Sequence, residues 1–117
     1  MAWEIEYTDE FFAWWDTLTA NEQEMITTAV TKLEQSGPAL GRPFVDTIKG
    51  SRHANMKELR PRSNIRVLFA FNPLRTAILL IGGDKTGRWE EWYAEMIPVA
   101  DDLYDVHLRE IGQEGAT

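Results

Sequence analysis

The residues best suited to chemistry lie in one stretch, "MKELRPRSNIRVLFAF", which runs from position 56 to position 71. It contains one acid and four cations, namely Glu58, Lys57, Arg60, Arg62 and Arg66. A guanidinium binds phosphate through a planar fork of donors and stabilises the negative charge of a phosphorane. A carboxylate can take the proton from an RNA 2′-hydroxyl. Together these residue types indicate phosphodiester chemistry.

Two predicted strands decide which of these side chains can meet. In a strand over 56–60, Glu58 and Arg60 share one face, because side chains alternate along a strand. If a second strand over 65–72 pairs antiparallel with the first, Arg60 and Arg66 lie close together with Glu58 as their neighbour. We therefore expect Glu58 to be the general base, and both arginines to stabilise the phosphorane with their guanidiniums at an open face. The alternative is a surface Glu–Arg pair, which contributes at most about 1 kcal/mol.

A basic connector, "RPFVDTIKGSRHAN", precedes this stretch and supplies Lys49, Arg52 and His53. His53 is a second candidate for the base, because the unperturbed pKa of histidine is about 6.5. We expect these three residues, together with Lys57 and Arg62, to position RNA.

A further group of cations and aromatic residues follows the last predicted strand. Lys85 and Arg88 stand beside Trp89, Trp92 and Tyr93 in the sequence. Aromatic faces stack on bases and cations hold phosphates, so this group is suited to the rim of a site for a single strand. Lys85 would donate charge or a proton, while Arg88 and Tyr93 would help to position RNA.

The cations are concentrated in one part of an acidic chain. The net charge is −7, yet residues 42–88 hold ten of the twelve cations and three of the nineteen acids, which leaves +7 there and −14 elsewhere. Salt confines the influence of each charge to about 8 Å at physiological ionic strength. The middle of the chain can therefore attract phosphate despite the overall charge, although a merely solvated basic face has the same composition.

Length and composition limit the class of protein. We expect the 117 residues, 1–117, to form one domain, and the 44% hydrophobic content supports a core rather than disorder. The absence of cysteine excludes disulfides and cysteine-based zinc sites, and no His/Asp/Glu spacing suggests a metal, so we expect neither metal nor cofactor.

The start "MAWEIEYTDEFF" does not resemble a signal peptide, and "AILLIGG" is far shorter than the roughly 20 residues that span a bilayer. We expect a cytoplasmic protein without membrane contact.

Hydrophobic periodicity predicts an α+β fold with a small, mostly antiparallel sheet of about four strands. An N-terminal pair of helices and a C-terminal helix would pack on this sheet. Residues 37–55 are expected to be a loop, Gly82 and Gly83 to end the last strand, and Pro98 to break the C-terminal helical region into two. The predicted order is strand 3–7, two helices up to about residue 35, strands 56–60, 65–72 and 76–81, and the C-terminal helical region from Trp89.

The chain resembles the RelE/HigB-like superfamily of toxins from type II toxin–antitoxin modules, particularly the phage-derived HigB-like branch. The resemblance covers nearly the whole chain and rests on four segments in order: "GPALGRPFVDTIKGSRHANMKELRP", "IRVLFAF", "AILLIGGDKTG" and "WYAEMIPVADDLYDVHL". It implies a RelE-like microbial RNase fold that cleaves mRNA, usually on the ribosome, by attack of a 2′-hydroxyl on the adjacent phosphate. It also implies a cognate antitoxin, often a helix-turn-helix protein.

The resemblance also implies roles for particular residues. Arg66 matches the arginine that stabilises the transition state, and Arg60 matches a phosphate-binding arginine. Lys85 or Arg88 falls near the basic position after the fourth strand, and Tyr93 near an aromatic residue that stacks on or orients a base. The competing class is a ParE-like toxin, which binds DNA gyrase and is not an RNase.

Overall fold

The computed structural model describes residues 2–112. Its elements, in chain order, are β1 (Glu4–Tyr7), α1 (Asp9–Trp15), α2 (Ala20–Ser36), the short 3-10 helix η1 (Gly37–Ala39), β2 (Val45–Thr47), β3 (Met56–Leu59), β4 (Ile65–Phe71), β5 (Thr76–Asp84) and α3 (Trp89–Glu110). Threonines begin the first two helices: the Thr8 hydroxyl accepts a hydrogen bond from the Phe11 amide, and Thr19 forms a reciprocal capping box with Glu22.

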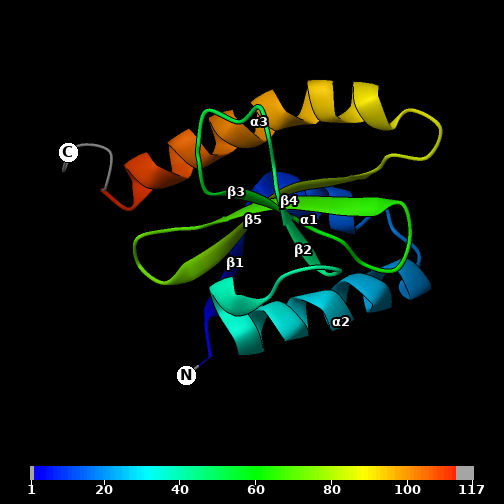
Figure 1. The fold of residues 1–117 in the computed structure, drawn as a ribbon, viewed down its shortest axis with the longest axis horizontal. Coiled ribbons are helices and arrows are strands. Elements are labelled where there is room, and N and C mark those ends of the chain that lie inside the picture. Colours follow the sequence, from blue (N-terminus) through cyan, green and yellow to red (C-terminus); the bar gives the residue numbers. More distant parts are fainter. Residues whose placement is uncertain (1, 113–117) are drawn as a thin grey trace.

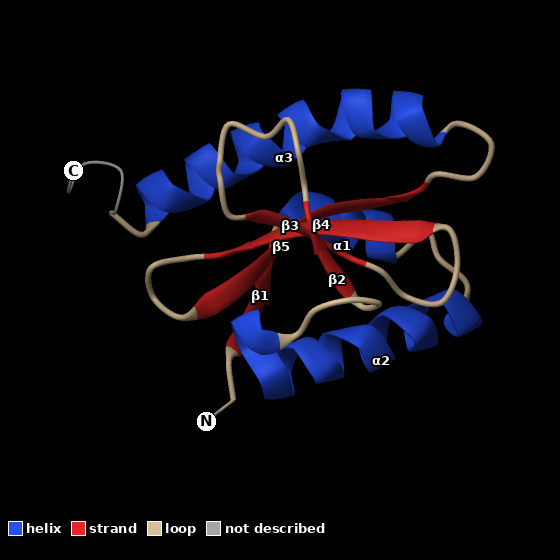
Figure 2. Ribbon diagram, viewed as in Figure 1, coloured by secondary structure: helices blue, strands red, loops and turns tan. Residues whose placement is uncertain are grey.

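One sheet separates two helical layers. The strand order is β1-β5-β4-β3-β2, with β1 parallel to β5 and the other neighbours antiparallel. Helix α2 lies on one face of the sheet and α3 crosses the other (Figures 1 and 2). Helix α1 belongs to the α2 side, because Phe11 shares a buried cluster with Ile26 and Leu33 of α2. The α+β class and the mostly antiparallel sheet are therefore confirmed.

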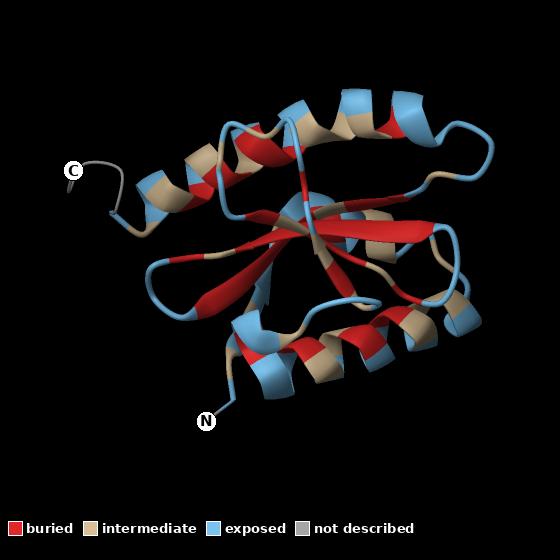
Figure 3. Ribbon diagram, in the orientation of Figure 1, coloured by how far each residue is buried: buried red, intermediate tan, exposed pale blue. Residues whose placement is uncertain are grey.

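The central strands are covered on both faces. Six of the seven β4 residues are buried, and Phe69, Leu68 and Leu80 have no measurable exposure. Phe69 packs in the cluster beneath α1 and α2, whereas Leu68 and Leu80 pack beneath α3. Figure 3 shows this buried centre with exposed helix surfaces and loops around it. Polar side chains that take part in chemistry must therefore lie near the ends of the strands or at the edges of the sheet.

The expectation of about four strands was wrong, because the sheet has five. The additional strand is β2, which lies within the segment predicted to be a loop. It pairs antiparallel with β3, so that Val45 stands opposite Leu59 and Thr47 opposite Lys57. Three residues are too short for a period-two pattern to be recognised among the surrounding glycines and prolines. This pairing brings Lys49, just after β2, towards the polar residues of β3.

The predicted break at Pro98 was also wrong. Helix α3 continues through Pro98 from Trp89 to Glu110. Proline removes one backbone hydrogen bond, but tertiary packing holds the helix: Trp92 before Pro98 and Tyr104 after it are both buried against the sheet. One continuous helix therefore connects Tyr93, at one end of the sheet, to a group of aspartates further along.

The glycines of "GGDKTG" do not end β5, as the sequence had suggested. A side-chain Cβ on Gly82 would lie 2.2 Å from the Trp14 ring, and one on Gly83 would lie 2.3 Å from the Trp92 ring. The two indoles cover opposite faces of the same strand, since neighbouring strand residues face opposite sides. These glycines permit close approach of α1 and α3 to the sheet.

This packing predicts that Gly82→Ala lowers the free energy of unfolding by about 1–3 kcal/mol, because the methyl group must displace the Trp14 ring. Gly41→Ala is the matched control, since a Cβ there meets nothing within 4 Å, and its effect should stay within about 0.5 kcal/mol. Urea unfolding of both variants measures the difference. Equal stabilities for the two variants would show that Trp14 can move without cost.

Candidate active site

A pocket of about 390 Å³ opens between the β2–β3 end of the sheet and the first half of α3, and we call it the β3–α3 pocket. Its polar lining contains Lys49, Glu58, Arg60, Lys85 and Tyr93, and Thr47, Ile48, Trp89 and Ile97 complete it. The first five are residues that the sequence marked for chemistry or RNA binding. The fold brings them together from segments far apart in the chain.

Among the described residues that line this pocket, Glu58 is the only acid, and it is 7% exposed. It stands opposite Leu68 in the β3–β4 register and therefore faces α3. The Tyr93 hydroxyl donates a hydrogen bond of 2.5 Å to Glu58 Oε1. Burial, and then this hydrogen bond, raise the pKa of Tyr93 to about 12. The phenol consequently keeps its proton at neutral pH and acts as a donor, leaving the carboxylate as the candidate base.

Arg66 lies beside Glu58 but not at an open face. Its Nε is 3.6 Å from Glu58 Oε1, and the residue is 6% exposed. Its Nη1 donates to the backbone oxygens of Ser63 at 2.9 Å and Ile65 at 2.7 Å, while Nε is buried without a hydrogen-bond partner. The expected exposed guanidinium was therefore wrong: β4 is covered by α3 at this point. Arg66 supplies positive charge behind the carboxylate.

Arg60 occupies a more open position than Arg66. It follows the end of β3, lines the β3–α3 pocket, and lies 3.9 Å from Asp46 through Nη1. Its amide donates to the Phe44 oxygen at 2.7 Å, which fixes the chain where it leaves the sheet. Of the two arginines, Arg60 is the one whose side chain lines the space where a phosphate would bind.

Trp89 and Lys85 form the rim of the pocket. The Lys85 ammonium lies 5.7 Å from the centre of the Trp89 ring, and Trp89 is 56% exposed. The Trp89 ring also meets Tyr93 edge to face at 6.5 Å. An exposed indole next to a cation provides a surface on which an unstacked base can lie while its phosphate is neutralised.

Three of the predicted RNA-binding cations lie outside this pocket. The Lys57 ammonium donates to the Thr47 hydroxyl at 3.0 Å, and its register partner Phe69 belongs to the α2 side of the sheet. Arg62 lines a separate hollow beside α2. Arg88 pairs with Glu95 of α3 at 2.6 Å. These cations do not converge on Glu58.

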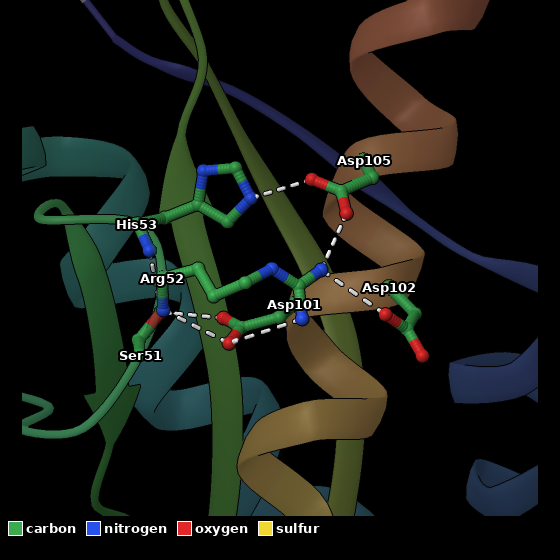
Figure 4. Close-up of polar contacts among 6 residues, drawn as sticks. All are labelled: Ser51, Arg52, His53, Asp101, Asp102 and Asp105. Carbon is green, nitrogen blue, oxygen red and sulfur yellow. Dashed lines mark hydrogen bonds and ion pairs between the residues drawn. The ribbon is translucent and has the colours of Figure 1, made fainter.

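Arg52 and His53 also have other partners. The Arg52 guanidinium is within 3.0 Å of Asp102 and 2.5 Å of Asp105, and His53 Nε2 lies 2.7 Å from the second Asp105 oxygen. Figure 4 shows these contacts joining the β2–β3 loop to α3. Burial favours a higher pKa for Asp105, but the hydrogen bonds from His53 and Arg52 outweigh it and lower that pKa.

The centre of this arrangement is the buried Asp101. Its carboxylate accepts hydrogen bonds from the Ser51 hydroxyl and from the Arg52 amide, the latter at 3.0 Å, and the residue is 2% exposed. We call this set the aspartate clamp: Ser51, Arg52, His53, Asp101, Asp102 and Asp105. The three acids were not predicted from the sequence, although "DDLYD" places them on neighbouring turns of one helix. The clamp holds the loop that presents Lys49 to the pocket.

Two features are absent from the described residues 2–112. No group of three or more His, Cys, Asp or Glu side chains is arranged there to hold a metal ion. No helix in the same range is long and apolar enough to cross a bilayer.

The fold and the pocket define a small α+β protein with a polar site at the end of its sheet. Residues 13–105 match the family described as phage derived protein Gp49-like (DUF891), and the chain belongs to that family. Two curated relatives from Mycobacterium tuberculosis, named as candidate toxins HigB2 and HigB3, are each 52% identical, over 82% and 75% of this chain. The matched region spans 50% of HigB2 and 78% of HigB3.

Solved structures support the same assignment of the fold. A mutant of the E. coli toxin RelE in the free state has a TM-score of 0.61 at 14% identity, covering 81% of this chain and 94% of that one. The RelE–RelB complex of Pyrococcus horikoshii has a TM-score of 0.60 at 15% identity, and the match covers 74% of this chain and 99% of that one. The RelBE2 toxin–antitoxin complex of Mycobacterium tuberculosis has a TM-score of 0.57 at 12% identity, and the match covers 72% of this chain and 99% of that one. The chain therefore has the fold of these RelE structures and is a homologue of the two HigB relatives.

The aspartate clamp predicts unequal effects of two neighbouring substitutions. Asp101→Ala should lower the free energy of unfolding by about 1–3 kcal/mol, because the Ser51 hydroxyl and the Arg52 amide are left without their acceptor. Asp102→Ala is the matched control: its side chain is 76% exposed, so its effect should stay within about 0.5 kcal/mol. Thermal and urea unfolding measure both. Equal destabilisation would contradict the central role of Asp101.

Proposed function

We propose that this chain is the toxin of a type II toxin–antitoxin module and that it cleaves mRNA without a metal. The observation that carries the proposal is the β3–α3 pocket, in which Lys49, Arg60 and Lys85 surround the Glu58–Tyr93 pair. Membership of the Gp49-like family and the HigB relatives support the toxin assignment. They favour it over a ParE-like inhibitor of gyrase.

The proposed reaction begins at the RNA 2′-hydroxyl. Glu58 accepts its proton as the 2′-oxygen attacks the adjacent phosphorus, and the bond from phosphorus to the 5′-oxygen then breaks. Lys85 donates a proton to the departing 5′-oxygen. The products are a 2′,3′-cyclic phosphate and a 5′-hydroxyl, so no water is consumed in this step. Lys49 and Arg60 stabilise the charge on the phosphorane.

Tyr93 and Arg66 position the base in this scheme. Tyr93 keeps its proton because its pKa is raised to about 12, and its hydrogen bond occupies Oε1 of Glu58. The other carboxylate oxygen is left for the 2′-hydroxyl. Arg66, with Nε 3.6 Å from Oε1, places positive charge beside this carboxylate and holds it in position. His53, the alternative base, contacts Asp105 in the clamp and is not among the residues lining the pocket.

The substrate and partners follow from the same proposal. Trp89 stacks on an unpaired base at the rim, which favours single-stranded mRNA such as that exposed on a translating ribosome. A cognate antitoxin, of the helix-turn-helix type, neutralises the toxin. Both partners belong to the cytoplasm, and the scheme calls for no cofactor.

Glu58→Gln tests the role of the base. The amide keeps the shape of the side chain but cannot take the proton, so RNA cleavage should fall by roughly 10²–10⁴-fold while circular dichroism stays unchanged. Induced expression of Glu58→Gln should also no longer arrest growth, because cleavage of mRNA is lost. Glu24→Gln, on the exposed surface of α2, is the control and should retain both activities.

The chemical nature of the RNA ends provides a second measure. Wild-type protein should leave 2′,3′-cyclic phosphate or 3′-phosphate ends on mRNA. Intact transcripts together with accumulated gyrase–DNA breaks would contradict the proposal and favour the ParE-like class. A fully active Glu58→Gln protein would instead exclude Glu58 as the base.

The cations of the pocket predict the salt dependence of RNA binding. Substitution of Lys49, Arg60 and Lys85 by Ala should reduce the slope of log K against log salt by about 0.7 for each phosphate that the variant no longer neutralises. Arg75→Ala, in the turn between β4 and β5 and outside the β3–α3 pocket, is the control and should leave the slope unchanged. Titration of a single-stranded RNA at several salt concentrations measures it. An unchanged slope in the triple variant would mean that these cations do not bind phosphate.

A further inference from the structure

A second hollow with cations in its wall lies beside α2, and we call it the α2 hollow. Its volume is about 420 Å³, and it is lined by Met25, Thr28, Ala29, Lys32, Phe44, Pro61 and Arg62. Among the described residues that line it there are two cations and no acid. The hollows beside β1 instead contain glutamates, namely Glu6, Glu34 and Glu110. The α2 hollow is therefore suited to an anionic group.

Both cations of the α2 hollow keep their charge uncompensated. The Lys32 ammonium lies 4.9 Å from the centre of the Phe44 ring, and an aromatic face attracts a cation without neutralising it. Arg62 is exposed. Within the described part of the chain, neither Lys32 nor Arg62 forms an ion pair with an acid. A phosphate that reaches these two side chains does not have to displace a carboxylate.

The α2 hollow and the β3–α3 pocket adjoin at the residues that follow β3. Arg60 lines the pocket, and its amide donates to the Phe44 oxygen at 2.7 Å. Phe44 and Arg62 line the hollow, so a single residue, Pro61, separates an arginine of the pocket from an arginine of the hollow. Helices α2 and α3 cover opposite faces of the sheet (Figure 1). A chain that passes from the pocket to the hollow therefore bends around the end of β3.

One acid borders this passage. Asp46 of β2 lies 2.9 Å from Arg42 and 3.9 Å from Arg60, so two guanidiniums share one carboxylate and the balance stays positive. We call the cations along the passage the cationic seam: Lys49 and Lys85 at the pocket, Arg60 where β3 ends, and Arg62 and Lys32 at the hollow. The seam continues the positive charge of the pocket onto the opposite face of the sheet.

We propose that the α2 hollow is a second RNA subsite, and that the cationic seam leads a single strand to it from the β3–α3 pocket. A phosphate of the strand lies between Lys32 and Arg62, and the attached nucleotide packs against the apolar wall formed by Met25, Ala29 and Pro61. The inference rests on the proposed function and deepens it, because it specifies an RNA that extends beyond the nucleotides joined by the scissile phosphate. Binding at the subsite does not itself require cleavage.

The bend around β3 favours a single strand over a duplex. A single strand can turn between nucleotides and present unstacked bases, whereas the paired bases of an A-form duplex hold it straight. Continuity favours RNA over an acidic polypeptide, because the seam begins at a pocket whose residues suit phosphodiester chemistry and RNA has a phosphate at every nucleotide. An acidic polypeptide attracted only to the α2 hollow would not depend on Arg60 or on the cations of the pocket.

Equilibrium binding tests the subsite without any need for cleavage. The probes are single-stranded RNAs of about ten and about two nucleotides, methylated at every 2′-oxygen so that no 2′-hydroxyl can attack. We expect the long probe to bind more tightly than the short one. Lys32→Gln combined with Arg62→Gln should weaken binding of the long probe about tenfold, and should reduce its slope of log K against log salt by about 0.7 for the phosphate that is no longer neutralised. Fluorescence anisotropy at several salt concentrations measures both.

Two control variants separate charge at the α2 hollow from charge elsewhere. Arg75→Gln removes a positive charge from the turn at the other end of β4, where the Arg75 guanidinium lies 4.6 Å from the centre of the Trp3 ring, and its slope should equal that of the wild type. Lys32→Arg combined with Arg62→Lys keeps both charges and should also retain the wild-type slope. Circular dichroism should be unchanged in every variant.

Three results would overturn the subsite. The first is an equal salt slope for the wild type and for the variant that loses both charges, and the second is equal affinity of the wild type for the long and the short probe. The third is binding of polyglutamate that depends on Lys32 and Arg62 while RNA binding does not, which would assign the α2 hollow to an acidic polypeptide. A duplex probe that loses as much affinity as the single strand would overturn the preference for unpaired RNA.

Cleavage of unmodified RNA distinguishes failure of the subsite from failure of the proposed function. The ratio of kcat/KM for long over short RNA should fall in the variant that loses both charges, in proportion to its loss of affinity. A wild-type chain that binds the long probe through Lys32 and Arg62 but cleaves no RNA would contradict only the RNase assignment. A chain that cleaves long and short RNA equally well, with or without these two charges, would contradict only the subsite.

Discussion

The hydrogen bond between Tyr93 and Glu58 is the interaction on which the candidate site depends. It joins α3 to β3 across 35 positions of the chain, and Arg66 supports the same carboxylate from within the sheet. Glu58 is 7% exposed, and a polar side chain buried to that extent needs such partners. The site therefore forms only when α3 packs on the sheet, and its chemistry depends on that packing.

Among the polar contacts that attach α3 to the rest of the fold, two bear on the candidate site. Near its start, Tyr93 contacts β3; further along, Asp101 holds the β2–β3 loop. Because Lys49 and Arg52 belong to that same loop, the second attachment also determines where a pocket cation lies. The aspartate clamp thus has a structural role, although it lies away from the reacting atoms. Arg52 and His53 belong to the basic segment of the sequence, but they form part of the clamp and do not line the pocket.

Much of the fold follows from local patterns in the sequence. The long helices and the strands β3 and β4 show periodicity, β5 is recognisable as a short run that is apolar on both faces, and the alternation around Glu58 correctly places it next to Arg66. The strand β2 is too short to have a pattern of its own, and the helix through Pro98 is sustained by contacts with the sheet. Gly82 and Gly83 have a role only once Trp14 and Trp92 are in place. In each case tertiary packing overrides the local signal.

The candidate site was likewise predicted in part, because some of its features depend on tertiary packing. Residue type and strand alternation selected Glu58, whereas Lys85 and Tyr93 were selected as a cation and an aromatic residue after the last predicted strand and by the family resemblance. Burial of Arg66 could not be predicted, since it depends on how closely α3 covers β4. The partners of Arg52 lie about fifty positions away in the sequence, and one chain without its fold contains no signal that pairs them.

The two tryptophans that rest on adjacent glycines have a consequence for cooperativity. Trp14 covers Gly82 from one layer and Trp92 covers Gly83 from the other, so both helical layers depend on the same short piece of β5. If either layer detaches, that backbone meets water and the opposite indole loses its support. The two hydrophobic clusters, although separated by the sheet, should therefore melt as a single unit, and the chain should lack a stable half-folded state.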